Sequence, residues 1–174
     1  EKLDILKKFL DQNEIDHYFV SGLDNIAWLL NLRADDIKYT PLLYSYLLIS
    51  KNNKHSLYIK ESAMPETLKK EIQTLININN IENIGSIFNK IKSSESIGLD
   101  FNSTTYYFLD LLRKQKINTK NLANPCILLK AIKNETEIDG AKKAHIRDGV
   151  SITKYIYWLK TVSYTHLRAH ETVD

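Results

Sequence analysis

The chain has 174 residues, a formal net charge of +3, an apolar fraction of 43% and one cysteine, Cys126. Its length suits one domain, or one domain with a piece of another, and the small net charge predicts neither a nucleic acid nor an anionic membrane as a partner. A single cysteine excludes an intrachain disulfide and a multi-cysteine zinc site and fits a cytoplasmic location, and no apolar run approaches the ~20 residues that span a bilayer.

Helical and extended patterns alternate through the N-terminal part of the chain. Residues 3–13 carry their apolar side chains on one helical face, and residues 15–20 form an apolar run that is typical of a strand. A helix follows, with Asp24 as its expected N-cap, and after a charged loop a strand is expected over residues 42–50. Because this second strand is apolar almost throughout, it predicts a sheet that is covered on both faces.

The helix and loop between these two strands contain three candidates for a substrate cleft, Trp28, Arg33 and Asp36. The charged loop side chains have two open interpretations. Either they form a solvent-exposed ion pair that ends the helix, or Arg33 points into a cleft and binds a carboxylate, which its planar guanidinium suits. Trp28 is expected to be a buried core residue, with a place at the rim of the cleft as the alternative.

The middle of the chain continues the α/β pattern. An Asn52–Asn53 turn predicts a hairpin between residues 42–50 and 55–60, with His55 expected at the surface because no partner stands at metal-binding spacing. Further helices are expected at residues 62–76, 85–94 and 104–115, the last capped by Ser103, and further strands at residues 78–84, 96–100 and 117–122. We therefore expect an α/β fold with a mixed sheet covered by helices on both faces.

The sequence changes character after residue 124. We expect a domain over residues 1–124, followed over 125–161 by a linker and a long helix, because a residue before proline favours extended geometry. Asn134 and Glu137 form a capping-box pattern that opens this C-terminal helix. Its apolar stripe, from Ile138 to Leu159, requires a surface that a single helix cannot supply.

The last segment, residues 162–174, does not continue the helical pattern that precedes it. His166 and His170 stand four residues apart, as in helical metal sites, but Glu171 lies outside the pair, unlike the order in H-E-x-x-H. The letters YTHLRAHET resemble a translated sequencing adapter. We interpret the segment as an artefact rather than a metal site, and we expect the true sequence to differ after about Lys160.

Two segments resemble the Xaa-Pro aminopeptidase (aminopeptidase P) family of the creatinase/prolidase superfamily. The first reads LDNIAWLLNLRADDI at residues 23–37 and is followed by Pro41 and by YSY at residues 44–46. The second reads NPCILLKAIKNETEIDGAKKAHIRDGV at residues 124–150. The resemblance implies a fragment that holds the middle, creatinase N-terminal-like domain and the first helix of a truncated metallopeptidase domain, with the family's first domain upstream.

The same resemblance implies the activity of the parent enzyme. Such enzymes release the N-terminal residue that precedes a proline, act on peptides with proline at the second position, and are expected to form homodimers. They use a divalent metal pair, expected to be manganese, to polarise the scissile carbonyl and activate a water molecule. Their ligands (two Asp, one His and two Glu) lie downstream of the helix that starts at Asn134.

This chain is therefore expected to hold no catalytic residue and no metal ligand, to bind no metal and to be inactive alone. Its role would be to shape access to the active site of the parent. Two alternatives stay open: a prolidase or creatinase-like relative, and a stand-alone, non-enzymatic binding module.

Overall fold

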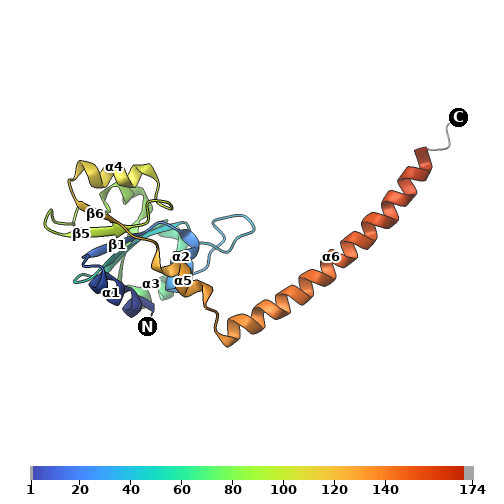
Figure 1. Ribbon diagram of the computed structural model, residues 1–174, viewed down its shortest axis with the longest axis horizontal. Coiled ribbons are helices and arrows are strands. Elements are labelled where there is room, and N and C mark those ends of the chain that lie inside the picture. Colours follow the sequence, from blue (N-terminus) through green and yellow to red (C-terminus); the bar gives the residue numbers. More distant parts are fainter. Residues whose placement is uncertain (1, 171–174) are drawn as a thin grey trace. The chain divides into compact units, whose positions relative to one another are not determined.

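The computed structural model describes the backbone of residues 2–170, and the side chains in that range other than those of Glu61 and residues 163–170 (Figure 1). The chain divides into two compact units, Glu1–Ala131 and Ile132–Asp174. The first unit contains a sheet with helices on both faces. The second is built on one long helix, α6 (Glu135–His170). The expected α/β fold with a long C-terminal helix is thereby confirmed.

The first unit is organised around one six-stranded mixed sheet with the strand order β4-β3-β2-β1-β5-β6. The strands are β1 (His17–Val20), β2 (Ser45–Ser50), β3 (His55–Ile59), β4 (Ile76–Asn80), β5 (Ser96–Leu99) and β6 (Asn118–Asn121). The expected hairpin is confirmed, because β2 pairs with β3 in antiparallel register. β1 is antiparallel to β2 and parallel to β5, and β3 is antiparallel to β2 and parallel to β4, so an antiparallel centre is flanked by parallel pairs.

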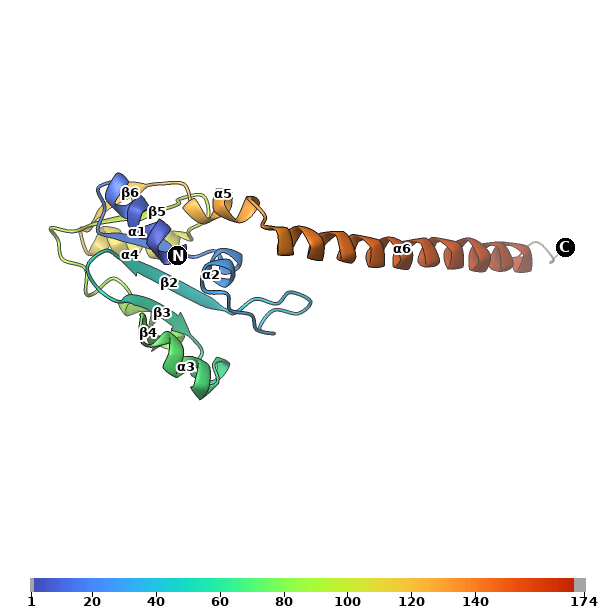
Figure 2. The same ribbon diagram turned by 90° about the horizontal axis from the view of Figure 1, so that it is seen from below.

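Helices cover both faces of this sheet (Figures 1 and 2). They are α1 (Lys2–Gln12), α2 (Leu23–Leu30), α3 (Glu66–Ile72), α4 (Tyr106–Lys114) and α5 (Pro125–Ala131), with short 3-10 turns η1 (Glu61–Ala63) and η2 (Ile81–Ser86). Side chains of α1, α2, α3 and α5 pack into the core on one face. α4 and the turn that follows η2 supply the core on the other face.

The strands divide their side chains between these two cores by simple alternation. In β1, Tyr18 and Val20 belong to the core under α1 and α2, whereas Phe19 points to the opposite core. There the Phe19 ring centroid lies 4.7 Å from that of Phe108 and 5.3 Å from that of Phe88. The central strands are thus buried on both faces, which accounts for their nearly continuous apolar sequence.

Several of the expected helices differ from those in the structure. Residues 85–94 form no α-helix: η2 is followed by turns that carry Phe88 and Ile91 into the core without a helical ladder. α3 is shorter than expected because Pro65, with φ −60° and ψ 145°, is its N-cap and holds the chain extended before it. The N-cap of α2 is Gly22 rather than Asp24. The N-cap of α4 is Thr105 rather than Ser103.

His55 also lies differently from its expected place at the surface. The side chain is buried, only 4% exposed, and its Nδ1 accepts a hydrogen bond from the Ser50 amide at 3.2 Å. Burial, with a smaller contribution from the charge of Lys7, lowers the pKa of His55 below its usual value. A buried imidazole that accepts a hydrogen bond through Nδ1 is stabilised in its neutral form.

The segment after β6 belongs to the first unit. Asn124 Oδ1 accepts a hydrogen bond from the Cys126 amide at 2.9 Å, which opens α5, and Cys126 is fully buried in the core. Lys130 on α5 forms an ion pair with Asp24 on α2. The division of the chain therefore falls after Ala131, later than the boundary at residue 124 that the sequence suggested.

α6 begins with the capping box that the sequence predicts. The Glu137 amide donates to Asn134 Oδ1, and the Asn134 amide donates to a Glu137 carboxylate oxygen, each at 2.9 Å. The helix continues to His170, past the end expected near Lys160. The side chains of His166 and His170, and all of Glu171, lie outside the described part of the structure. Within residues 2–170, none of the helices has the length and apolar character needed to cross a membrane.

Gly98 in β5 allows a close approach that a side chain would prevent. A Cβ atom there would lie 2.7 Å from Ile15 Cδ1 and 2.9 Å from both Leu122 Cδ1 and Tyr18 Cδ2. We predict that Gly98→Ala lowers the free energy of unfolding of the first unit by about 1–3 kcal/mol, because the added methyl group overpacks the core. Urea denaturation provides the measurement. Gly149→Ala, on α6 with nothing within 4 Å, is the control and should leave that transition unchanged.

The buried His55 predicts a pH-dependent stability. Below about pH 6.5 the unfolded chain takes up a proton that the folded state resists, so the free energy of unfolding should fall as the pH drops toward about 5. In His55→Asn, whose amide oxygen can replace Nδ1 as the acceptor, this part of the loss should disappear. Urea denaturation midpoints at about pH 7 and about pH 5 test this. His145→Gln, which replaces an exposed histidine, is the control and should keep the pH dependence of the unchanged chain. An unchanged pH dependence in His55→Asn would refute the assignment.

Candidate functional site

The loop between α2 and β2 is the candidate functional region, because it carries two of the three cleft candidates from the sequence. Asn31 ends α2 in a left-handed conformation, φ 54° and ψ 35°, and its amide donates to the Ala27 carbonyl. The loop then projects away from the sheet before β2 begins at Ser45 (Figures 1 and 2). Loops that a rigid sheet positions in this way are common places for binding residues.

Arg33 uses its guanidinium to complete the end of α2. Its Nη1 donates to the Ala27 carbonyl at 2.7 Å and to the Leu32 carbonyl at 2.8 Å. A cation at a helix C-terminus satisfies free carbonyls and interacts favourably with the helix dipole. Among the described residues Arg33 forms no ion pair with a loop carboxylate. The arrangement agrees with a residue that ends the helix, although carbonyls rather than an aspartate are its partners.

Asp36 closes the base of the loop instead of pairing with Arg33. Its Oδ2 accepts a hydrogen bond from the Tyr44 amide at 2.8 Å, which joins the two sides of the loop. At the tip, a short bridge pairs Ile37 with Thr40. Tyr39 lies between them with a positive φ of 66° and 93% of its surface exposed. The sequence analysis did not select Tyr39, although an aromatic residue in a polar loop, two positions before Pro41, is a signal that could have identified it.

Trp28 lies between the two places that the sequence allowed. The side chain is half-buried and packs against the core under α1 and α2. The Lys2 ammonium stands 4.3 Å from the centroid of its ring and donates to the Trp28 carbonyl at 2.6 Å. This cation–π contact covers the indole from the side of α1. Trp28 is therefore partly a core residue, and Lys2 rather than a cleft occupies one face of its ring.

A shallow hollow adjoins the base of the loop and brings polar groups from four segments together. It is lined by Asp36, Tyr44, Lys60, Ser62, Asn80, Ile81 and Glu82. The Tyr44 ring meets that of Tyr46 edge to face at 6.1 Å, and Tyr46 packs on the Phe108 ring at 4.9 Å. Burial, followed by the interaction with Tyr44, raises the pKa of Tyr46 to about 12, so its phenol stays neutral. Tyr44, which lines the hollow, is thus connected through Tyr46 to the core residue Phe108.

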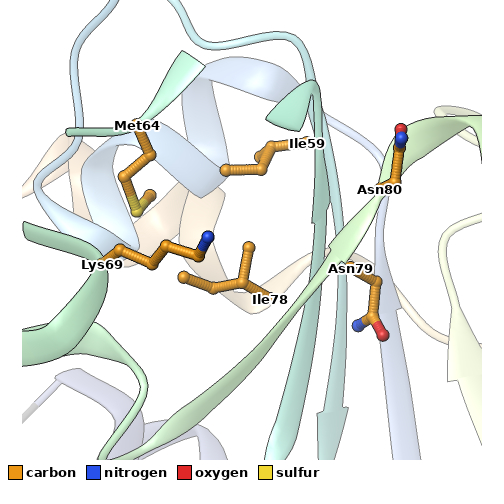
Figure 3. Close-up of a pocket in the computed structure, with 6 residues that line it drawn as sticks. All are labelled: Ile59, Met64, Lys69, Ile78, Asn79 and Asn80. Atoms are coloured by element: carbon orange, nitrogen blue, oxygen red, sulfur yellow. The ribbon is translucent and has the colours of Figure 1, made fainter. Parts of the chain in front are cut away.

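A second, smaller pocket lies between α3 and the ends of β3 and β4. Figure 3 shows the Lys69 ammonium directed toward Ile59 and Ile78, with Met64 beside them. Lys69 also pairs with Glu66 on its own helix at 3.3 Å. One cation over an apolar floor can bind a ligand but offers no acid–base pair, so this pocket is not a candidate reaction centre.

The described residues do not fit a metal site. Across that part of the chain, no three His, Cys, Asp or Glu side chains come together in a group that could hold a metal ion. The chemistry of a divalent metal pair therefore cannot be assigned to the side chains that the structure describes. The residues near the α2–β2 loop can bind and position a polar ligand, but they hold no nucleophile with an adjacent base.

Comparison with known proteins identifies relatives of this chain by sequence. The family model of the creatinase/prolidase N-terminal domain matches residues 1–137. An Xaa-Pro aminopeptidase of Drosophila melanogaster is 34% identical over 163 residues, which is 92% of this chain and 26% of that protein. Xaa-Pro aminopeptidase 1 of Dictyostelium discoideum is also 34% identical, over 164 residues, with 92% and 25% covered. The chain thus spans about a quarter of the length of these relatives.

Solved structures show the same fold. An X-prolyl aminopeptidase from Caenorhabditis elegans, described as a cytosolic enzyme with a di-nuclear active site, aligns with a TM-score of 0.76 at 24% identity, covering 92% of this chain and 27% of that one. A prolidase from Pyrococcus furiosus aligns with a TM-score of 0.53 at 18% identity, covering 76% and 36%. At these identities the likeness concerns the fold alone.

The position of Trp28 predicts a difference in accessibility between the two tryptophans. Iodide should quench the fluorescence of Trp158, which is 56% exposed on α6, more strongly than that of Trp28, which the core and Lys2 cover. Trp28→Phe and Trp158→Phe each leave a single emitting indole for the measurement. Equal quenching of the two would contradict the packing described for Trp28.

Proposed function

The chain belongs to the creatinase/prolidase N-terminal domain family, and we propose that it is the non-catalytic domain of a metal-dependent Xaa-Pro aminopeptidase together with the first helix of the catalytic domain. The whole enzyme would release the N-terminal residue that precedes a proline in a peptide. Relatives with that name, similar over 92% of this chain, support the proposal.

The observation that carries the proposal is the apolar stripe of α6. Ile152, Ile156 and Leu159 recur at helical spacing and are exposed, as is Ile138 near the start of the helix. The capping box gives α6 a defined start, but a helix alone cannot bury its own apolar stripe. A partner surface is therefore required. In an Xaa-Pro aminopeptidase the catalytic domain that follows would supply it.

Within the parent enzyme, this domain would shape the entrance to the active site. The α2–β2 loop is suited to that task because the Asp36 hydrogen bond and the Arg33 cap hold its base while Tyr39 is presented at its tip. Of the three cleft candidates, Asp36 lines an open hollow, whereas Arg33 and Trp28 are engaged with α2 and α1. We assign substrate contact to Asp36 and a supporting role to the other two.

The same proposal covers the cofactor, the assembly and the location of the parent. A divalent metal pair, with manganese as our choice, would be held by residues beyond this chain, and the enzyme would be a cytoplasmic homodimer acting on peptides with proline at the second position. The description of the Caenorhabditis elegans enzyme as cytosolic and di-nuclear supports the metal pair and the location. Residues 162–174 remain proposed as an artefactual tail.

A prolidase is the second candidate, because the fold is shared with the Pyrococcus furiosus prolidase. The two activities differ in the length of peptide accepted. A prolidase cleaves an Xaa-Pro dipeptide, whereas an Xaa-Pro aminopeptidase also accepts Xaa-Pro-Xaa, so the two substrates separate the candidates.

We predict that the 174-residue chain hydrolyses neither substrate with manganese present and shows no stoichiometric manganese binding by calorimetry, because its described residues form no ligand group. The chain extended by the sequence that follows Lys160 in its gene should cleave the tripeptide. Turnover by the 174-residue chain, or an extended protein that cleaves only the dipeptide, would contradict the proposal.

In the extended enzyme, Asp36→Asn should raise the KM for the tripeptide more than it lowers kcat, because the residue contacts substrate away from the reacting bond. Asp35→Asn, a neighbouring exposed loop carboxylate, is the matched control. An equal rise in KM from both substitutions would contradict the assignment of substrate contact to Asp36.

A further inference from the structure

A separate hollow lies on the face of the sheet that carries α4, over β2, β3 and β4. It is lined by His17, Leu48, Ser50, Asn53, Lys54, Ser56, Tyr58, Asn77, Ile87, Lys90, Ile91, Lys92 and Glu95. These residues come from four strands, the β2–β3 turn and the segment between η2 and β5. None of them belongs to the α2–β2 loop or to its hollow.

The floor of this hollow is apolar. Leu48, Tyr58 and Ile87 are all buried members of the core on this face, and Ile91 joins them. Burial raises the pKa of the Tyr58 phenol, which therefore stays neutral. A ligand that displaced water from this floor would gain hydrophobic contact in addition to any polar interaction.

The rim of the hollow is cationic. Because Ile87, Phe88 and Ile91 turn inward, Lys90 and Lys92 are left exposed on the outer side of the same turn. Across the hollow, Lys54 projects from the β2–β3 turn, and its Nζ donates to the Gln73 carbonyl at 3.1 Å. Within the described part of the chain, the ammonium groups of Lys90 and Lys92 have no hydrogen-bond partner.

One carboxylate faces these three lysines, and it is held in the wall. Glu95 Oε2 accepts a hydrogen bond from the Lys92 amide at 2.9 Å and lies 3.2 Å from His17 Nε2. The hydrogen bond from the Lys92 backbone is the main reason that the pKa of Glu95 is lowered. His17 is itself buried and fixed on its other side, with Nδ1 3.0 Å from Ser50 Oγ. Leaving His17 aside, three lysines against one glutamate give the hollow a net charge of +2.

We propose that this hollow binds a small organic phosphate: a phosphate dianion between the lysines, attached to an apolar body that rests on the floor. The net charge of the lining, +2, is equal in size and opposite in sign to that of the dianion. Ammonium groups form strong, charge-assisted hydrogen bonds to phosphate oxygens. Ser56 and Asn77, which are paired neighbours on β3 and β4, add a hydroxyl and an amide for further hydrogen bonds. The site is independent of the peptidase function proposed above.

Amide NMR of the 174-residue chain tests this inference with three probes: phenyl phosphate, inorganic phosphate and phenol. Phenyl phosphate should bind in a saturable way and shift the amides of residues 53–56 and 90–95. Inorganic phosphate should bind more weakly and phenol weakest of the three, because each supplies only half of the complementary chemistry. Absence of saturable shifts at millimolar concentration, or equal binding of inorganic phosphate, would overturn the proposal.

Charge variants test the rim. The double substitution Lys90→Gln and Lys92→Gln should weaken the affinity for phenyl phosphate about tenfold or more. The double substitution Lys90→Arg and Lys92→Arg keeps the charge and should retain binding, which would also show that the turn still folds. Lys8→Gln with Lys70→Gln, on α1 and α3 at the opposite face, is the matched control and should leave the affinity nearly unchanged. An equal loss of affinity in the control would mean that only the overall charge of the chain matters, and it would overturn the proposed site. Tighter binding of a glutamate-rich peptide than of phenyl phosphate would make the surface a protein-docking face and would equally overturn it.

Discussion

Burial of the central strand β1 on both faces is the constraint on which the rest of the first unit depends. Tyr18 and Val20 pack on one face in the core that α1, α2 and α5 cover, and Phe19 packs on the other face in the core that α4 and the turn after η2 cover. A strand buried in this way needs two covering layers, and the order of helices along the chain supplies them in turn. Function is then left to what the layers do not cover: the ends of strands, the projecting loop and the uncovered stretch over β3 and β4.

The parts of the fold that could be predicted from the sequence are those that local chemistry decides. The capping box at Asn134 and Glu137 is such a case, because both hydrogen bonds join residues three apart. The β2–β3 hairpin is another, since an asparagine turn between two apolar runs leaves few alternatives.

The errors arise where distant residues decide. The 85–94 segment has apolar side chains that suit a helix, yet the core draws them in from turns, and His55 is buried by packing that no local pattern reveals. Arg33 could be placed beside the end of α2, but its preference for the Ala27 and Leu32 carbonyls over a loop aspartate depends on the actual path of the loop. The hollow ringed by Lys54, Lys90 and Lys92 could not be foreseen at all, because it needs the sheet order to bring two distant turns together.

The central proposal is that this chain joins a creatinase/prolidase N-terminal domain to a helix that requires the rest of an enzyme. Hydrogen exchange over residues 138–159, compared between the 174-residue chain and the chain extended beyond Lys160, tests it most directly. We expect fast exchange in the short chain and strong protection in the extended one, with residues 17–20 of β1 protected in both. Strong protection of residues 138–159 in a monomeric short chain would contradict it, because α6 would then have found a partner without the catalytic domain.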